Sequence, residues 1–238
     1  MSETVQNELL AVSDLHAWYG ESHVLHGASF SVKRGELVTL LGRNGAGKTS
    51  ILKSIMGLVG RRSGSISVNG HETIRMQTHR IARLGIGYCP EERGIFSSLN
   101  VEENLLLPPV IKVGGMSMDE IYEMFPNLLE RKKSIGTRLS GGEQQMLAMA
   151  RILRTGADLL LLDEVTEGLA PVIVQSIGRM VRQLKERGFT IILVEQNFHF
   201  AAELADRHYV IEHGTIADMI TKDEVAGSRE KLNRYLGV

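Results

Sequence analysis

Residues 42–49 read Gly-Arg-Asn-Gly-Ala-Gly-Lys-Thr, and this stretch decides the fold of the chain. Its three glycines let the backbone curl so that successive N–H groups point toward one centre. An apolar run over 36–41 precedes the stretch and a helical pattern over 50–58 follows it. The turn therefore opens a helix whose N-terminus carries a partial positive charge. The pattern GxxxxGK[ST], at this place between strand and helix, predicts a loop that binds phosphate groups.

The residue types in this loop suit a nucleoside triphosphate. Lys48 is expected to reach the β- and γ-phosphates of ATP, and the Thr49 hydroxyl to coordinate Mg²⁺. The alternative is a glycine-rich turn before an unrelated helix, a pattern that arises by chance in roughly one or two chains in a hundred of this length. The predicted nucleotide-binding residues of the loop are Gly42, Arg43, Asn44, Gly45, Ala46, Gly47, Lys48, Thr49 and Ser50.

Two carboxylates follow an apolar run further along the chain. Leu159–Leu162 reads as a buried strand, and Asp163 and Glu164 come directly after it. Asp163 is expected beside the phosphate loop, where it can hold Mg²⁺, usually through water. Glu164 is then suited to polarise the attacking water as general base. Alone, such a pair often only ends a strand, so the prediction depends on the phosphate loop upstream.

The remaining pattern alternates strands and helices. A helix is predicted to start at Pro171, to bury one apolar face and to end at Gly188. This alternation implies a mostly parallel sheet covered on both faces. The predicted buried strands span 37–41, 85–89, 159–163, 190–194 and 208–211.

The front and the middle of the chain differ from this α/β pattern. Short segments over 8–15 and 24–32 suggest an antiparallel β layer, and residues 93–155 read as mainly helical, with one helix over 143–155. We therefore expect a single domain over 1–238. Its α/β core with the β layer comprises 1–92 and 156–238, and 93–155 is a helical subdomain inserted into it.

Composition limits the possible functions. Hydrophobic residues make up 43%, charged residues 23%, and the formal net charge is -1, so no general attraction to nucleic acid or anionic lipid follows. The single cysteine, Cys89, excludes an internal disulfide and suits a reducing compartment. No secretory signal is recognisable, and the longest apolar stretches are far short of the roughly 18 residues of a membrane span. We expect a cytosolic protein whose membrane role depends on a partner.

Residues 139–145, which read LSGGEQQ, resemble the signature motif of ABC ATPases. Ser140 can cap a helix that begins at Glu143, while two glycines expose backbone N–H groups to a phosphate. A plain Ser-capped helix explains the local pattern but not its occurrence with the other motifs. The resemblance implies a P-loop core of ABC ATPase type, and two subunits that enclose two ATP molecules between them. It also implies that Leu139, Ser140, Gly141, Gly142 and Glu143 contact the nucleotide of the opposite subunit.

Other positions can be placed by the same resemblance. Tyr19 resembles the aromatic residue that stacks on adenine, with Trp18 as the competing candidate. Residues 168–171 resemble the loop that crosses to the other subunit. Glu91 stands where the family usually has glutamine, and it can still reach a Mg²⁺-bound water.

The position of the family's switch histidine departs from the family pattern. It is occupied here by Gln196, which can hydrogen-bond a γ-phosphate but cannot become a cation. His199, three residues further on, is the alternative sensor of that phosphate.

Four segments narrow the family further. PE-x-R-x-x-F over 90–96, VEENL over 101–105, GLAP over 168–171 and VEQN over 194–197 together resemble the ATP-binding subunits of branched-chain amino acid importers, the LivF type. Such subunits usually have Pro and Ser where this chain has Val165 and Thr166, which leaves the substrate group open.

The resemblance implies an ATP hydrolase that uses ATP and Mg²⁺ and drives the uptake of branched-chain amino acids. Its expected partners are a second ABC ATPase subunit, identical or not, two transmembrane permease subunits and, indirectly, a periplasmic or extracellular binding protein. Its expected place is the inner face of the cell membrane. The alternatives are a urea or short-chain amide importer, a lipopolysaccharide exporter and, least favoured, a non-transport ABC ATPase acting on DNA or the ribosome. That last class is expected to carry a coiled-coil insert or a second ATPase domain and a basic face.

Overall fold

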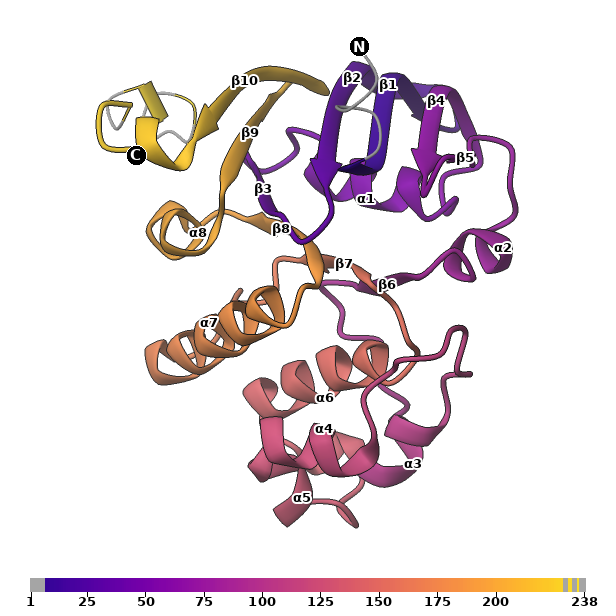
Figure 1. Cartoon of the computed structure of the whole chain (residues 1–238), viewed down its shortest axis with the longest axis vertical. Helices are drawn as coiled ribbons and strands as arrows, with labels where there is room; N and C mark the ends of the chain where they lie inside the picture. The colour runs from indigo at the N-terminus through magenta and orange to yellow at the C-terminus, as the bar shows by residue number, and fades with distance from the viewer. Residues whose placement is uncertain (1–6, 229–230, 233–234, 236–238) are drawn as a thin grey trace.

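The computed structural model describes residues 7–228, 231–232 and 235; the other residues of the predicted domain lie outside this description. A six-stranded sheet forms the centre of the fold (Figure 1). Five of its strands are parallel neighbours, and the sixth, β10, pairs antiparallel with β9. In sheet order the strands are β10 (Thr215–Thr221), β9 (Arg207–Glu212), β3 (Leu37–Leu41), β8 (Thr190–Glu195), β7 (Leu159–Asp163) and β6 (Ile86–Cys89).

Both faces of this sheet are buried, as the almost continuous apolar runs predicted. Successive residues of β7 point to opposite sides: Leu159 and Leu161 pack into one hydrophobic cluster, Leu160 and Leu162 into another. The first cluster includes α1 (Lys48–Ile55) and the second includes α7 (Pro171–Glu186). The sheet is therefore the shared wall of two cores.

A second sheet of four antiparallel strands packs into the first of these cores. Its order is β2 (Ser22–Lys33), β1 (Glu8–Tyr19), β4 (Arg61–Val68) and β5 (His71–Glu72). The sequence predicts an antiparallel layer from the front of the chain, but not the two strands that 61–72 add to it. In β4 only Ile66 and Val68 are buried, so the apolar signal of this segment is weak.

The remaining core helices are α2 (Thr78–Ala82) and α8 (Phe198–Leu204). Helix α7 has the expected form, with Pro171 in its first turn and a buried face that includes Ile177, Val181 and Leu184. It ends at Glu186, and Gly188 follows with a φ of 88° that favours glycine. Across the described ranges of the chain, no helix is both long and apolar enough to cross a membrane.

Between β6 and β7 the regular elements are short helices and one isolated β-bridge, joined by turns and loops. Here lie α3 (Val101–Leu106), α4 (Met118–Met124), α5 (Pro126–Glu130), a 3₁₀ turn (Gly136–Arg138) and α6 (Gly141–Leu153). Helices α3, α4 and α6 each start with a reciprocal capping box, which satisfies two backbone donors at each helix start. In Figure 1 these helices occupy the end of the molecule opposite the antiparallel β layer. A further 3₁₀ turn (Lys222–Glu224) follows β10.

The carboxyl ends of three neighbouring parallel strands meet at one edge of the central sheet. β3 ends at Leu41, just before the glycine-rich loop, β7 ends at Asp163, and β8 ends at Glu195. In such sheets this edge is where ligands bind.

Candidate functional site

The glycine-rich loop connects β3 to α1, and two of its glycines are required by their surroundings. A Cβ atom on Gly42 would lie 2.4 Å from the backbone oxygen of Ile211. Gly47 directly precedes α1 with a φ of 111°, and a Cβ there would lie 2.9 Å from Leu25. Glycine at these two positions therefore lets the loop pack closely against β9 and β2 and keeps the start of α1 free of side-chain atoms.

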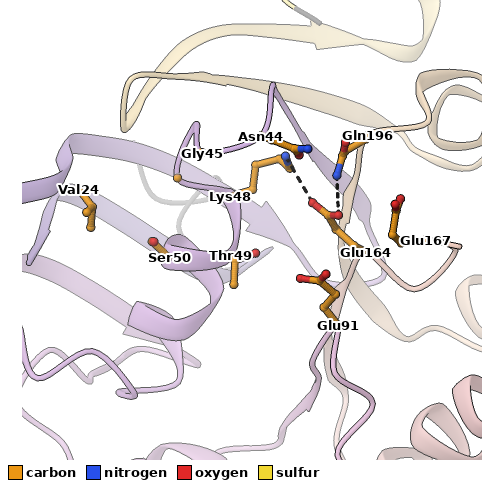
Figure 2. A pocket seen from close by; sticks show the side chains of 11 residues that line it. Val24, Asn44, Gly45, Lys48, Thr49, Ser50, Glu91, Glu164, Glu167 and Gln196 are labelled. Atoms are coloured by element: carbon orange, nitrogen blue, oxygen red, sulfur yellow. Dashed lines mark hydrogen bonds and ion pairs between the residues drawn. The ribbon is translucent and has the colours of Figure 1, made fainter. Parts of the chain in front are cut away.

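A cavity of about 510 Å³ opens over this loop. Figure 2 shows the loop and the start of α1 on one side of it, and acidic and amide side chains on the other. Of the residues predicted for catalysis and magnesium binding, the cavity wall contains Lys48, Thr49, Glu91, Glu164 and Gln196. Residues about 150 positions apart in the chain thus share one site. Glu167 also lines it, which the sequence did not predict.

The Glu164 carboxylate is held from two sides (Figure 2). Its Oε1 lies 3.5 Å from Lys48 Nζ, and its Oε2 accepts a 2.6 Å hydrogen bond from Gln196 Nε2. Lys48 also donates to the backbone oxygens of Gly42 and Arg43, at 2.9 and 3.2 Å. Glu164 has a φ of 47°, an uncommon conformation for a residue other than glycine, and backbone strain of this kind often occurs at functional sites.

Asp163 is buried beneath this cavity. It accepts hydrogen bonds from Thr49 Oγ1 and from the Tyr88 hydroxyl, each 3.0 Å long. Burial raises the pKa of Asp163, the two donors oppose that shift, and the carboxylates of Glu164 and Glu91 add to it. Hydroxyl and carboxylate oxygens side by side are ligands that a hard cation such as Mg²⁺ accepts.

Tyr88 was not predicted from the sequence. Burial and the neighbouring Asp163 raise the pKa of its phenol, which keeps it a hydrogen-bond donor. An aromatic residue inside an apolar strand is ordinary core composition, so the sequence carries no signal for this contact across 75 positions.

The predicted signature residues, Leu139 to Glu143, lie at the start of α6. Ser140 Oγ accepts a 3.3 Å hydrogen bond from the Glu143 N–H, and Glu143 accepts one of 2.7 Å from the Ser140 N–H. Within the described part of the chain, none of these five residues lines the cavity over the glycine-rich loop. Their contact with the nucleotide of an opposite subunit stays a prediction.

The two aromatic candidates for the base differ in their surroundings. Trp18 stacks on His23, with ring centroids 4.3 Å apart, and the Arg61 guanidinium lies 4.6 Å from the Trp18 ring. Tyr19, the last residue of β1, is 45% exposed. Tyr19 therefore has the more accessible ring, although Val24 and not Tyr19 lines the cavity.

The sequence left open whether Gln196 or His199 would face a γ-phosphate. The structure places Gln196 in the cavity beside Glu164, whereas His199 is the second residue of α8 and lines a neighbouring cavity.

The two residues after Glu164 that depart from the importer pattern are both buried. Val165 is fully buried in the second core. Thr166 donates its hydroxyl to Glu195 Oε2 at 2.8 Å and its N–H to Glu195 Oε1 at 3.3 Å. Burial raises the pKa of Glu195 to about 7, although these hydrogen bonds oppose the shift. Glu195 was not predicted, because nothing in the sequence links it to Thr166.

Comparison with known proteins agrees with this geometry. The sequence profile of the ABC transporter family matches residues 25–167. The high-affinity branched-chain amino acid transport ATP-binding protein BraG of Pseudomonas aeruginosa is 41% identical, over 96% of this chain and all of that protein. The lipopolysaccharide export system ATP-binding protein LptB of Haemophilus influenzae is 32% identical over 96% of this chain and 97% of its own length.

A solved structure described as the ATP-binding subunit of an ABC transporter superposes with a TM-score of 0.79. It is 28% identical and covers 97% of this chain and 100% of its own. The predicted fold class is thereby confirmed. With the family profile matching more than half of its residues, this chain belongs to the ABC transporter family of ATP-binding subunits and is an ATP hydrolase.

Proposed function

We propose that this chain drives the import of branched-chain amino acids, as the subunit that hydrolyses ATP on the cytoplasmic face of a membrane permease. The observation that supports this most is the 41% identity with BraG along the whole length of that protein. Lipopolysaccharide export is the second candidate, favoured by the 32% identity with LptB.

In the proposed reaction the glycine-rich loop binds the phosphates of ATP. Backbone N–H groups at the start of α1 and the Lys48 ammonium supply positive charge at a place where phosphate oxygens accumulate negative charge. Lys48 Nζ already lies in the cavity, 3.5 Å from Glu164, so the cation and the base face the same space.

Glu164 is the proposed general base, which accepts a proton from the attacking water. The carboxylate is oriented by the Lys48 ammonium and by an N–H of the Gln196 amide. Neither of these two groups can accept the proton of the water, so that role falls to Glu164. Because Gln196 is neutral at every pH, its contact with Glu164 does not depend on protonation of that side chain.

Mg²⁺ fits the oxygen ligands of this site. Thr49 and Asp163 would hold the ion, directly or through water, and Glu91 faces the same cavity. When bound, Mg²⁺ neutralises phosphate charge.

The proposed site is completed by a second ATPase subunit. The start of α6 offers backbone N–H groups and the Ser140 hydroxyl, and the 13-residue helix adds its dipole. In the proposed assembly, two copies or two sister subunits close over two ATP molecules and move two permease subunits.

Purified protein tests the ATPase site. Lys48→Ala should abolish ATP turnover, whereas Lys53→Ala, five residues along the same helix, should keep it. An unchanged rate in Lys48→Ala would refute the role of the loop.

Transport is tested in cells that lack this gene. Complementation with the wild-type gene should restore leucine uptake, and the Lys48→Ala gene should not. Restored urea uptake, or restored lipopolysaccharide at the outer membrane with no change in leucine uptake, would contradict the proposed substrate and favour the corresponding alternative.

A further inference from the structure

We propose that Glu195 is a positioning residue that fixes the catalytic turn at Glu164 by holding Thr166. This inference rests on the proposed role of Glu164 as general base. Glu195 lines a cavity beside the one over the glycine-rich loop, and the proposed role requires no contact with ATP.

The Glu195 carboxylate is 3% exposed, and both of its oxygens accept hydrogen bonds from the same residue. Thr166 donates its backbone N–H to one oxygen and its hydroxyl to the other. A buried carboxylate is costly unless its oxygens are hydrogen-bonded. Here it engages both donors of the residue two positions after Glu164, which fixes the backbone and the side chain of Thr166 together.

Three consecutive residues, the last two of β8 and the one that follows it, hold this turn. The Val194 carbonyl accepts a 3.0 Å hydrogen bond from the Glu164 N–H, and Gln196 donates to the Glu164 carboxylate. Glu195, between them, holds Thr166. Glu164 has a positive φ, a conformation that persists only where surrounding contacts fix it. Removing the Glu195 contact therefore loosens the turn and leaves the direct contacts of Glu164 in place.

Burial of Glu195, together with the charged groups around it, makes this contact sensitive to pH. Glu164 and Glu167 lie on the turn, and His199 and Glu203 of α8 line the cavity that Glu195 also lines. Burial and the two carboxylates of the turn raise the pKa of Glu195 to about 7. An ionised Glu195 accepts both hydrogen bonds, whereas a protonated one carries a hydrogen on one oxygen, which is then the poorer acceptor for its Thr166 donor. The Thr166 contact therefore changes near neutral pH.

The test compares two substitutions of Thr166 by the steady-state kinetics of ATP hydrolysis. Thr166→Val keeps the shape and removes the hydroxyl, so kcat should fall about tenfold while KM for ATP stays within about twofold. Thr166→Ser keeps the hydroxyl and should retain kcat within about twofold. Equal losses in both variants, or wild-type kcat in Thr166→Val, would overturn the proposal.

The pH profile gives a second readout. The wild-type kcat should show an inflection near pH 7 that Glu195→Gln removes, because the amide does not titrate. Glu203→Gln, which changes a 77% exposed carboxylate at the same cavity, should keep the inflection. The double variant Thr166→Val/Glu195→Gln should be no slower than the slower single variant, since the two residues act through one contact. An inflection that survives in Glu195→Gln, or additive losses, would refute the coupling.

Glu164→Gln, measured in the same assay, distinguishes a wrong assignment of the general base from a wrong positioning role of Glu195. If Glu164→Gln turns over ATP normally, the base assignment is wrong and this inference falls with it. If Glu164→Gln is inactive while Thr166→Val behaves as wild type, only the positioning role of Glu195 is wrong.

Discussion

Acidification should destabilise this protein through His208, a histidine of β9 with no exposed surface. Its Nδ1 lies 2.7 Å from Thr39 Oγ1, and the Phe198 ring packs edge-on against it. Among the residues that the structure describes, Nε2 is buried without a hydrogen-bond partner. A protonated His208 ring would be removed from water, and its Nε2–H would have no hydrogen-bond acceptor among these residues.

Burial lowers the pKa of His208 from 6.5 to about 4. At 1.36 kcal/mol for each pKa unit, that difference corresponds to about 3 kcal/mol. The unfolded state binds the proton below pH 6.5, while the folded state does so only near pH 4. Protonation of His208 therefore does not reduce the free energy of unfolding above pH 6.5. It reduces that free energy by about 3 kcal/mol as the pH falls to about 4.

Urea unfolding at 25 °C, repeated between pH 7.5 and pH 4, measures this effect. His208→Gln cannot titrate, and its side-chain oxygen can accept from Thr39. It should therefore lose about 3 kcal/mol less than the wild type over this range. His79→Gln, at an exposed histidine of α2, is the control and should follow the wild-type curve. Parallel curves for wild type and His208→Gln would refute the reasoning.

Three further predictions concern the site and its support. Glu164→Gln should lower the rate of ATP hydrolysis about 10²–10⁴-fold while ATP stays bound in a closed dimer, as measured by turnover and by nucleotide retained on gel filtration; a normal rate excludes Glu164 as the base. Tyr88→Phe removes one donor to the buried Asp163 and should cost about 1–2 kcal/mol in urea unfolding; no loss would mean that water replaces the hydroxyl. Arg62 donates to one backbone carbonyl in the last turn of α1 and to three in the segment after β5, so Arg62→Leu should cost at least about 2 kcal/mol, and equal stability would show that these carbonyls find other donors.

The sequence predicts the elements whose signal is local. β7 and β8 are continuous apolar runs because both of their faces are buried. The turn before α1 carries a sequence pattern that is specific to phosphate-binding loops. β4, β5 and β10 were not predicted, because β4 and β5 consist mainly of small or polar residues and all three strands bury only part of their surface. Packing against neighbouring strands, and not their own composition, makes these segments extended.

The residues of the candidate site also fall into those with a local sequence signal and those without one. Motif residues such as Lys48 and Glu164 can be placed from their spacing. Tyr88 and Glu195 act through partners that are distant in the sequence, so only the register of neighbouring strands reveals their contacts. A single sequence contains no information on such pairs.

A crystal structure of Glu164→Gln with ATP and Mg²⁺ tests the central claim most directly. The account predicts the triphosphate on the loop before α1, with the γ-phosphate beside Lys48 and with the Ser140 helix start of a second subunit closing over it. A triphosphate bound elsewhere, or a γ-phosphate whose contacts all come from one chain, would contradict it.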